Sequence, residues 1–312
     1  MPKLPTALLL LFGLAAIAPP ALAQDGLADR FRTLGRGAAW EPVATIDLPF
    51  PSFHPQGMAR VGDRFLLSSV EILQPTRRYD APRDGLDRDA GRGTGHLFEV
   101  GPDGALLRSA TLGEGDIYHP GGVDFDGTHL WVPVAEYRPN SRSIIYRVDP
   151  ATLRAEEMFR APDHIGGLVF DRASGTLHGV SWGSRRFYAW KLGADGRPEG
   201  DPAAARPRAN PAQYVDYQDC HSVGDGMALC GGLNQYRPQG PQGPVLALGG
   251  LELVDLARGA PVHQLPVELW TGGGLPMTQN PFAVATQGAG LRFWFAPEDD
   301  HTRIFVYDVR PR

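Results

Sequence analysis

The chain has 312 residues, a net charge of −5, 39 glycines and 29 prolines. Acidic and basic side chains are mixed along it with no basic block, which excludes the electrostatic footprint of a nucleic-acid-binding protein. So many Gly and Pro residues indicate a chain divided by turns, and closed all-β architectures often reach this length as one domain.

The N-terminus predicts an exported protein. Lys3 precedes an apolar run over residues 4–17, and Ala21-Leu22-Ala23 is a small-x-small cleavage signal, as in a secretory signal peptide. The run is shorter than the roughly 20 apolar residues of a membrane-spanning helix. We therefore expect residues 1–23 to be removed and residues 24–312 to form a single domain, periplasmic or secreted, without a membrane span.

A repeated segment runs through the chain. His54-Pro55-Gln56-Gly57 aligns with His119-Pro120-Gly121-Gly122, and the same ungapped shift aligns Glu71 with Glu136. A third copy starts at His164 and a fifth at Asn280, while the divergent fourth has Gln218 or Asp219 in the His position and Asn234 in the Glu position. Self-similarity of this kind predicts a repeat architecture.

Each copy is followed by a loop and then by a run rich in aromatic and β-branched residues, and helical periodicity is absent. These runs cover residues 96–100, 144–149, 187–191, 251–256 and 304–309. Each unit is therefore interpreted as four strands, A to D, that make one blade, and the chain as an all-β, five-bladed β-propeller.

The last unit offers only three strands before the chain ends. Residues 43–48 supply a strand at the other terminus, so we expect 3+1 closure, in which this N-terminal strand completes the last blade and removes an exposed edge. A six-bladed propeller stays open as an alternative, because residues 196–211 are poor in strand signal and residues 240–250 could contain further structure.

The repeat predicts which side chains meet at the mouth of the central channel, because the loop before strand A and the loop after strand B share one face of a propeller. The His positions bring His54, His119, His164, Gln218 with Asp219, and Asn280 to this mouth. The Glu positions add Glu71, Glu136, Asn234 and Glu298, with Trp182 in the third blade. Three imidazoles with carboxylates favour a divalent metal of unknown identity. The alternative is that the His side chains bond loop carbonyls and recur only because the repeat recurs.

Arginines follow strand B in three blades. Tyr137-Arg138-Pro139 is echoed at Tyr236-Arg237-Pro238, and Arg185 follows Trp182 in the blade between. Guanidinium groups at the mouth indicate an anionic ligand, since they pair with carboxylate or phosphate through two hydrogen bonds. The alternative is that these loop arginines are merely solvated.

Three further polar features have local interpretations. Residues 80–93 are rich in Asp but lack the spacing of a calcium loop, so we interpret them as a charged insertion between strands B and C over the mouth. Asp124 and Asp126 precede a glycine and predict a turn. His221 falls inside a predicted strand A and is expected to be a hydrogen-bonded core residue.

The two cysteines are predicted to form a disulfide. Gly224-Asp225-Gly226 is a turn signal, and a hairpin centred on Asp225 places Cys220 directly opposite Cys230. Export to an oxidising compartment favours the bond. Two free buried thiols are the competing interpretation.

Several of these motifs resemble a known family. At His54-Pro55-Gln56-Gly57-Met58, Tyr118-His119-Pro120-Gly121-Gly122, Ala135-Glu136-Tyr137-Arg138-Pro139, Asp163-His164-Ile165-Gly166-Gly167 and Ser181-Trp182-Gly183-Ser184-Arg185 the chain resembles exported bacterial and fungal propeller proteins that form a domain family of unknown function. The resemblance covers nearly the whole mature chain. It implies a propeller and supplies no chemistry.

From the residues we predict a metal-dependent hydrolase or lyase acting on a small anionic or polar substrate. His54, His119 and His164 are the expected metal ligands, and Glu71 and Glu136 the expected general-base or outer-shell carboxylates. The expected substrate-binding residues are Arg138, Trp182, Arg185, Asn234, Arg237, Asn280 and Glu298. Two alternatives stay open: a metal-free glycoside hydrolase using a Glu pair, and a non-enzymatic binding or scaffold propeller.

Overall fold

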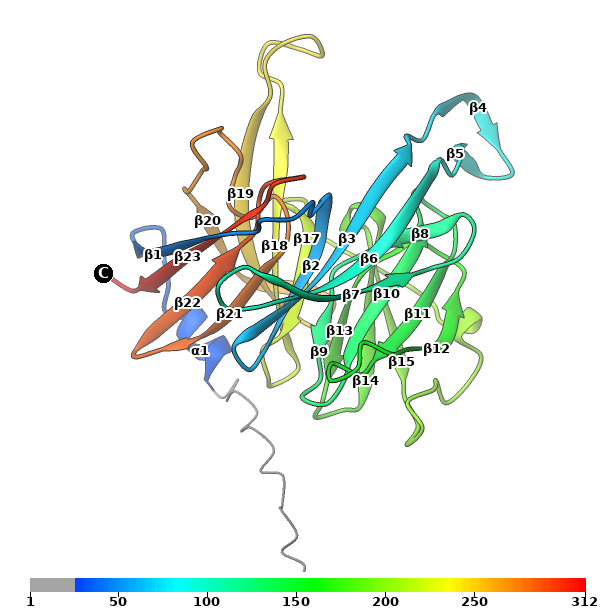
Figure 1. Cartoon of the computed structure of the whole chain (residues 1–312), viewed down its shortest axis with the longest axis horizontal. Coiled ribbons are helices and arrows are strands. Elements are labelled where there is room, and N and C mark those ends of the chain that lie inside the picture. Colours follow the sequence, from blue (N-terminus) through cyan, green and yellow to red (C-terminus); the bar gives the residue numbers. More distant parts are fainter. Residues whose placement is uncertain (1–25) are drawn as a thin grey trace, which may run out of the picture.

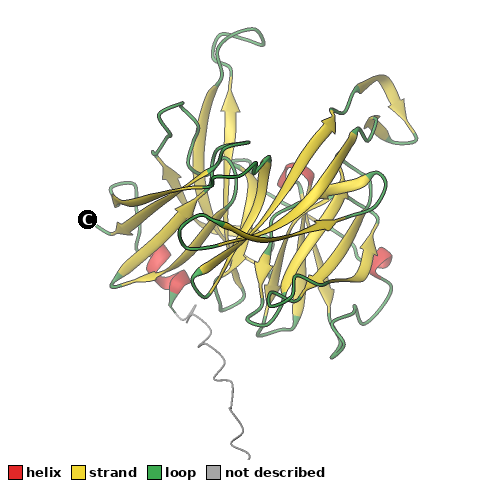
Figure 2. Ribbon diagram, in the orientation of Figure 1, coloured by secondary structure: helices red, strands yellow, loops and turns green. Residues whose placement is uncertain are grey.

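The computed structural model describes residues 26–312, so the predicted signal peptide, residues 1–23, lies outside the described residues. Residues 26–312 contain five antiparallel sheets arranged as the blades of a β-propeller (Figure 1, Figure 2). The inner strands of neighbouring blades contact one another around the common axis. The five-bladed prediction is confirmed.

The first four blades are each continuous in sequence. Blade 1 contains β2 (His54–Val61), β3 (Arg64–Gln74), β6 (Arg92–Val100) and β7 (Leu106–Leu112). Blade 2 contains β8 (Ile117–Pro120) and β9 (Asp124–Phe125), which both pair with β10 (Leu130–Glu136), then β11 (Ser143–Val148) and β12 (Ala155–Ala161). Blade 3 contains β13 (Ile165–Asp171), β14 (Thr176–Ser181), β15 (Arg186–Lys191) and β16 (Arg208–Ala209). Blade 4 contains β17 (Asp216–Ser222), β18 (Met227–Tyr236), β19 (Leu246–Asp255) and β20 (Ala260–Val267).

Blade 5 is closed by the N-terminal strand. It contains β21 (Phe282–Gln287), β22 (Gly290–Phe295), β23 (Arg303–Arg310) and, at its outer edge, β1 (Ala39–Asp47). The β1–β23 pairing runs from Ala39 opposite Arg310 to Asp47 opposite Arg303, with a shift in register after Pro42. Pro is tolerated there because β1 is an edge strand and its outer side needs no ladder donor. The predicted 3+1 closure is confirmed.

The two segments that could have formed a sixth blade contain little further secondary structure. Within residues 196–211 the chain forms only the short η2 (Pro202–Ala204) and the two-residue strand β16. Residues 240–250 belong to the tip of the β18–β19 hairpin and the start of β19 (Figure 1). The six-bladed alternative is therefore wrong.

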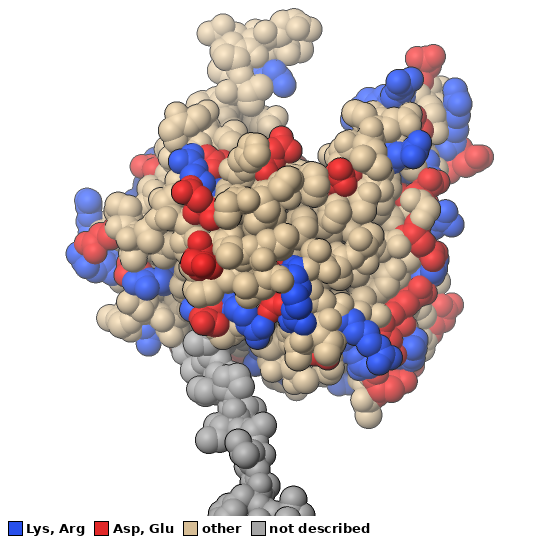
Figure 3. All heavy atoms as spheres, viewed as in Figure 1, with Lys and Arg blue, Asp and Glu red and all other residues tan. Residues whose placement is uncertain are grey.

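Two elements were not expected from the sequence. The helix α1 (Leu27–Arg32) buries Leu27 and Phe31 in the core between blades 4 and 5. The charged insertion forms a hairpin of its own, β4 (Arg78–Arg83) and β5 (Leu86–Arg88), which projects beyond blade 1 (Figure 1). In the space-filling view this arm carries both positive and negative side chains, whereas the β18–β19 arm is nearly uncharged (Figure 3).

Glycines of the repeated motif let the inner strands approach closely. A Cβ on Gly57 would lie 2.5 Å from the backbone nitrogen of Val123, so only glycine fits at this contact between blades 1 and 2. One blade further on, Gly122 and Gly167 form a parallel bridge between blades 2 and 3. The recurrence of glycine after His-Pro therefore has a packing reason.

Three buried side chains tie the blades together on the axis. Asp219 of β17 accepts hydrogen bonds from the backbone nitrogens of Met58 and Val123, at 2.9 and 3.1 Å. Asp124 of β9 accepts one from Phe170 in blade 3, at 2.8 Å. His221 lies 3.4 Å from Asp219 and donates to the Phe282 carbonyl of blade 5 at 2.6 Å.

We call Asp124, Asp219 and His221 the axial cluster, and its contacts reach all five blades. His221 is the buried, hydrogen-bonded core residue that was predicted. The turn predicted for Asp124 is wrong, because this carboxylate is buried in β9 and bonds to other blades. Asp126 does serve the turn, since its Oδ1 accepts from the backbone of Thr128 and His129 at 2.8 and 2.7 Å.

Candidate functional site

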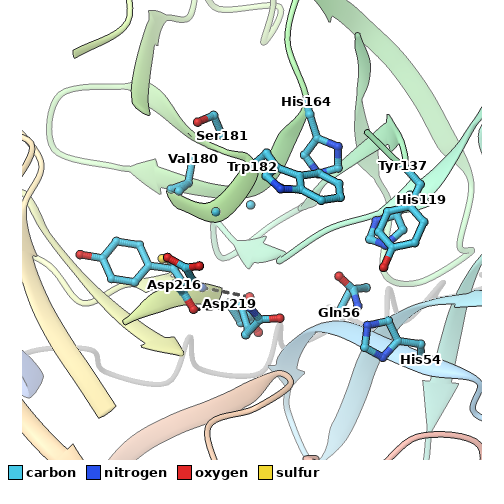
Figure 4. Close-up of a pocket in the computed structure, with 16 residues that line it drawn as sticks. His54, Gln56, His119, Tyr137, His164, Val180, Ser181, Trp182, Asp216 and Asp219 are labelled. Atoms are coloured by element: carbon cyan, nitrogen blue, oxygen red, sulfur yellow. Dashed lines mark hydrogen bonds between the residues drawn. The ribbon is translucent and has the colours of Figure 1, made fainter. Parts of the chain in front are cut away.

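A cavity of about 240 Å³ opens at the mouth of the channel (Figure 4). Blade 1 contributes His54 and Gln56, blade 2 contributes His119 and Tyr137, and blades 3 and 4 supply most of the rest. All three histidines that the repeat predicted to converge line this cavity. The inner-strand entry loops place them there, as the propeller geometry requires.

His119 is the least satisfied polar side chain of the site. Its ring is buried, and neither Nδ1 nor Nε2 has a hydrogen-bond partner among the described residues. It stacks on Tyr137 with ring centroids 4.2 Å apart and lies 5.9 Å from the His164 ring. Burial, and then the nearby His164 and His54, hold the pKa of His119 well below its ordinary value. The ring is therefore neutral, with an unused lone pair.

His164 is oriented by the backbone of blade 2. Its Nδ1 donates to the carbonyl oxygen of Glu136 at 2.8 Å, which leaves Nε2 unprotonated in the neutral ring. Burial lowers the pKa of His164 to about 4, so the ring stays neutral under physiological conditions. Its edge contacts Trp182, whose ring centroid lies 4.8 Å away.

His54 is oriented by a carboxylate of blade 5. Its Nδ1 lies 2.7 Å from Oδ1 of Asp299, and about a third of its side chain is exposed. Burial is the largest single effect and would raise the pKa of Asp299, but the interactions with His54 and the hydrogen bond from Asn280 together outweigh it and lower the pKa. In a neutral ring this pairing leaves Nε2 of His54 unprotonated, as in His164.

The two predicted carboxylates do not line the cavity. Glu136 is buried and pairs with Arg138 and Arg142, each through an Nε–Oε distance of 2.6 Å. Glu71 lies 3.3 Å from Nε2 of His96. Because each carboxylate already has a partner, the arrangement does not support their predicted catalytic roles. What Glu136 contributes is its backbone carbonyl, which orients His164.

Among residues 26–312, Trp182 alone of the seven predicted substrate-binding residues lines the cavity. Asn234 donates to the backbone oxygens of Gln213 and Tyr214 at 3.5 and 3.4 Å. Asn280 is buried and donates to Asp299 at 2.9 Å, while Glu298 pairs with Arg303 at 2.8 Å. These three polar groups are therefore held by the protein itself.

The arginines that were predicted to surround the mouth bond to nearby groups of the protein instead. Arg138 pairs with Glu136, Arg185 pairs with Asp216 at 2.5 Å, and Arg237 donates to the Gly243 carbonyl at 3.3 Å. In the described part of the chain the cavity lining includes Asp216 and Asp219 but no Lys or Arg. The geometry thus gives no support to an anionic ligand.

The insertion between blade 1 strands reaches the cavity wall. Arg88, at the end of β5, lies with its guanidinium carbon 5.1 Å from the Trp182 ring centroid. The carbonyl of Arg88 also accepts from Arg138 at 3.4 Å. The base of the insertion therefore lies at the edge of the mouth, whereas the β4–β5 hairpin projects beyond blade 1 (Figure 1).

Several lining residues, and Asp299 just outside the cavity, were not predicted as site residues. Tyr137 and Gln56 lie within the repeated motifs, and they line the cavity with His119 and His54. Membership of these motifs is therefore the signal that could have identified them. Asp216 had no such signal. Asp299 follows Glu298 directly, and the repeat aligned the wrong one of these neighbouring acids with the site.

Cys220 also lines the cavity, and it forms a disulfide with Cys230. The two residues are directly opposed in the β17–β18 ladder, which confirms the predicted pairing and its register. Within residues 26–312 no helix is long and apolar enough to cross a membrane.

Fold and cavity define a five-bladed propeller with a histidine cluster at its mouth. The chain belongs to a family of unknown function (DUF6454), whose profile matches residues 13–311. This membership confirms the resemblance drawn from the repeated motifs. A search of curated proteins found no match.

Solved structures share the fold at low sequence identity. Glutaminyl cyclase from Myxococcus xanthus has a TM-score of 0.51 and 14% identity, over 88% of this chain and 97% of that chain. A mannose phosphorylase from Leishmania mexicana, in complex with phosphate ion, has a TM-score of 0.50 and 10% identity, over 85% and 88%. Both of these propellers are enzymes, and identities this low show the fold alone.

Proposed function

We propose that this protein is a metal-dependent hydrolase or lyase whose cavity binds a small polar substrate. The observation that carries the proposal is His119, whose two buried ring nitrogens have no partner among the described residues. Leaving a polar group buried and unpaired is costly, so such a group marks a place where an ion or a ligand completes the structure.

The histidine set supports a transition metal as that missing partner. Neutral imidazole is a good ligand for zinc, copper, iron or nickel. Metal-bound histidines commonly donate their other ring nitrogen to a carboxylate or a backbone carbonyl, which is the arrangement of His54 with Asp299 and of His164 with Glu136.

The histidines have to move closer together to hold an ion. Two imidazoles on one tetrahedral zinc have ring centroids about 5 Å apart, whereas His119 and His164 are 5.9 Å apart. Among residues 26–312 no group of three or more His, Cys, Asp or Glu side chains converges closely enough for a metal. A small side-chain rotation of His119, which no hydrogen bond restrains, would therefore accompany loading.

The lining favours an uncharged polar substrate over an anion. His119 and His164 are neutral, and the neighbouring Tyr137 and Trp182 offer aromatic surface at a centroid separation of 5.6 Å. When bound, a metal of this class polarises a substrate oxygen and activates water. The residues of the chain would orient the substrate against the aromatic wall and exclude bulk water.

The cellular compartment is also a proposal. We infer export to the periplasm or the cell exterior, since the Cys220–Cys230 disulfide persists in oxidising compartments and is rare in the cytosol. The cleavage signal at residues 21–23, which lies outside the described residues, agrees with this location.

Elemental analysis tests the metal. Protein purified without chelators, or incubated with Zn²⁺ or Co²⁺ and then desalted, should hold close to one ion per chain. His119→Ala should lose it, and His301→Ala, which removes an exposed imidazole outside the cavity, should keep it. Wild-type protein that binds neither ion would refute the metal-dependent enzyme.

A metal-free binding propeller is the second candidate. The 5.9 Å separation of the His119 and His164 rings, with no metal-binding group among residues 26–312, is the observation that favours it. In that case His119 would hydrogen-bond the ligand directly. Saturation of the cavity by a neutral polar ligand without metal, with no turnover, would support this candidate. The glycoside hydrolase alternative has lost its basis, because Glu71 and Glu136 are engaged elsewhere.

A further inference from the structure

We propose that Asp299 is the positioning residue of His54, and that the chain Asn280–Asp299–His54 fixes the His54 tautomer at the cavity. This inference rests on the proposed function of the cavity. The Asp299 carboxylate accepts the Nδ1 proton of His54 at 2.7 Å, so that Nε2 keeps its lone pair. Asp299 itself does not line the cavity and acts only through His54.

Asp299 is held from behind by a buried amide. Nδ2 of Asn280 donates to Oδ1 of Asp299 at 2.9 Å and to the Pro297 carbonyl at 3.3 Å. The Asn280 side chain is almost fully buried, so this donor is fixed. Asn280 occupies the His position of the fifth blade, and the structure gives that position a supporting contact in place of a direct one.

The loop carrying Asp299 is joined to the segment before His54. The hydroxyl of Ser52 donates to the Asp300 carbonyl at 3.0 Å, and its oxygen accepts from the Thr302 nitrogen at 3.1 Å. The Asp300 nitrogen donates to the Phe53 carbonyl at 2.5 Å. These bonds join blade 5 to blade 1 directly beside the Asp299–His54 contact.

The backbone just before His54 is strained. Phe53 has a φ of 55°, a left-handed conformation that bulky residues rarely adopt. It is held there by stacking on His96, with ring centroids 4.9 Å apart. Strain of this kind persists where the surroundings enforce it, and it clusters at functional sites. The conformation of Phe53 directs the chain so that the His54 side chain reaches both the cavity and Asp299.

A purely structural role of Asp299 and a positioning role predict different experimental results. The Asp299 side chain is about half exposed, so solvent screens its charge and its loss should change stability little. A positioning role predicts a change in the His54 ring itself. The protonated nitrogen of an imidazole is observable by long-range proton–nitrogen NMR, which a mere loss of surface charge would not alter.

The test compares wild type with Asp299→Ala in metal-free, ¹⁵N-histidine-labelled protein, at a pH where His54 is neutral. We expect wild-type His54 to be protonated at Nδ1 only, and the variant to shift towards the Nε2-protonated form. Co²⁺ affinity should fall about 10- to 100-fold, as for loss of other residues that orient metal-bound histidines. Unfolding midpoints should match.

Asp300→Asn is the matched control. It removes one negative charge from the neighbouring position, and Asn tolerates the left-handed φ of 58° found there. This control should keep both the wild-type tautomer and the wild-type Co²⁺ affinity. If Asp299→Ala fails to fold, Asp299→Leu, which has a similar shape but no acceptor oxygen, takes its place.

The outcomes separate the two proposals. An unchanged His54 tautomer in the Asp299 variant overturns the positioning role, whatever the metal affinity. Wild-type protein that binds no Co²⁺ overturns the metal-dependent function, while the tautomer measurement still decides the role of Asp299. A shifted tautomer together with weaker Co²⁺ binding supports both.

Discussion

Raising the pH should lower the free energy of unfolding, because one buried residue, His221 of the axial cluster, loses its proton. Burial would lower its pKa, but the carboxylates of Asp219 and Asp124 outweigh burial and raise the pKa to about 9. An unfolded chain has a His pKa of about 6.5. Because the folded value is the higher one, the stabilisation is complete below pH 6.5 and is lost as the pH rises through 9.

The expected size follows from the difference between the two pKa values. Each pKa unit corresponds to about 1.4 kcal/mol, so the shift from about 6.5 to about 9 is worth about 3 kcal/mol of the free energy of unfolding. Most of this loss falls between about pH 7 and pH 9. A solvent-exposed histidine cannot produce it, since its pKa would barely change on folding.

Urea unfolding at several pH values across this window measures the loss. The matched variant combines His221→Gln with Asp219→Asn and Asp124→Asn, so that neither the imidazole nor either neighbouring carboxylate titrates. The amide of the introduced glutamine can still donate to the Phe282 carbonyl. The variant should be less stable than wild type at neutral pH and nearly insensitive to pH up to about 9. Equal pH dependence in both proteins would refute the assignment of the alkaline loss to His221.

Three further predictions address the rest of the fold. Burial depresses the pKa of His178 to about 4, so lowering the pH from 6.5 to 4 should reduce the free energy of unfolding of wild type by about 3 kcal/mol. Denaturant unfolding of His178→Gln should show a shallower dependence on acid pH. An equal dependence in the two proteins would contradict this. Deleting residues 39–50 removes β1 and exposes the edge of β23, so the unfolding midpoint should fall cooperatively, and an unchanged midpoint would disprove the role of the closure. Reducing the Cys220–Cys230 disulfide, whose sequence separation is 10, should cost about 2–3 kcal/mol, measured by unfolding with and without reductant after thiol titration has found none free in the oxidised protein.

The repeat made the architecture predictable. Equivalent His, Gly and Glu positions recur because each blade must start, approach its neighbour and turn in the same way. Aligning them was therefore enough to predict the five blades and the convergence of His54, His119 and His164. The disulfide followed from hairpin register, since a turn at Asp225 fixes which residues oppose each other.

Partner choice within the site was not predictable in the same way. A repeat places side chains on one face, but it does not say which neighbour each will bond. Glu136 is neutralised by Arg138, two residues away, and Arg185 by Asp216 in the next blade. Asp299 lies one residue beyond the aligned acid, and the strain at Phe53 has no sequence signature. Contacts that cross between blades depend on three-dimensional packing.

The way β1 completes blade 5 has a consequence for how the protein is made. Its pairing partner β23 is synthesised much later, since Asp47 and Arg303, which pair directly, are more than 250 residues apart in the sequence. Until then the β23 position in the ring is vacant, and pairings between such distant segments form slowly. During that interval the unpaired strand and the open edge of blade 5 are exposed to other chains. Folding helpers that act on this protein should therefore bind near β1, and they should be released when β23 pairs with it.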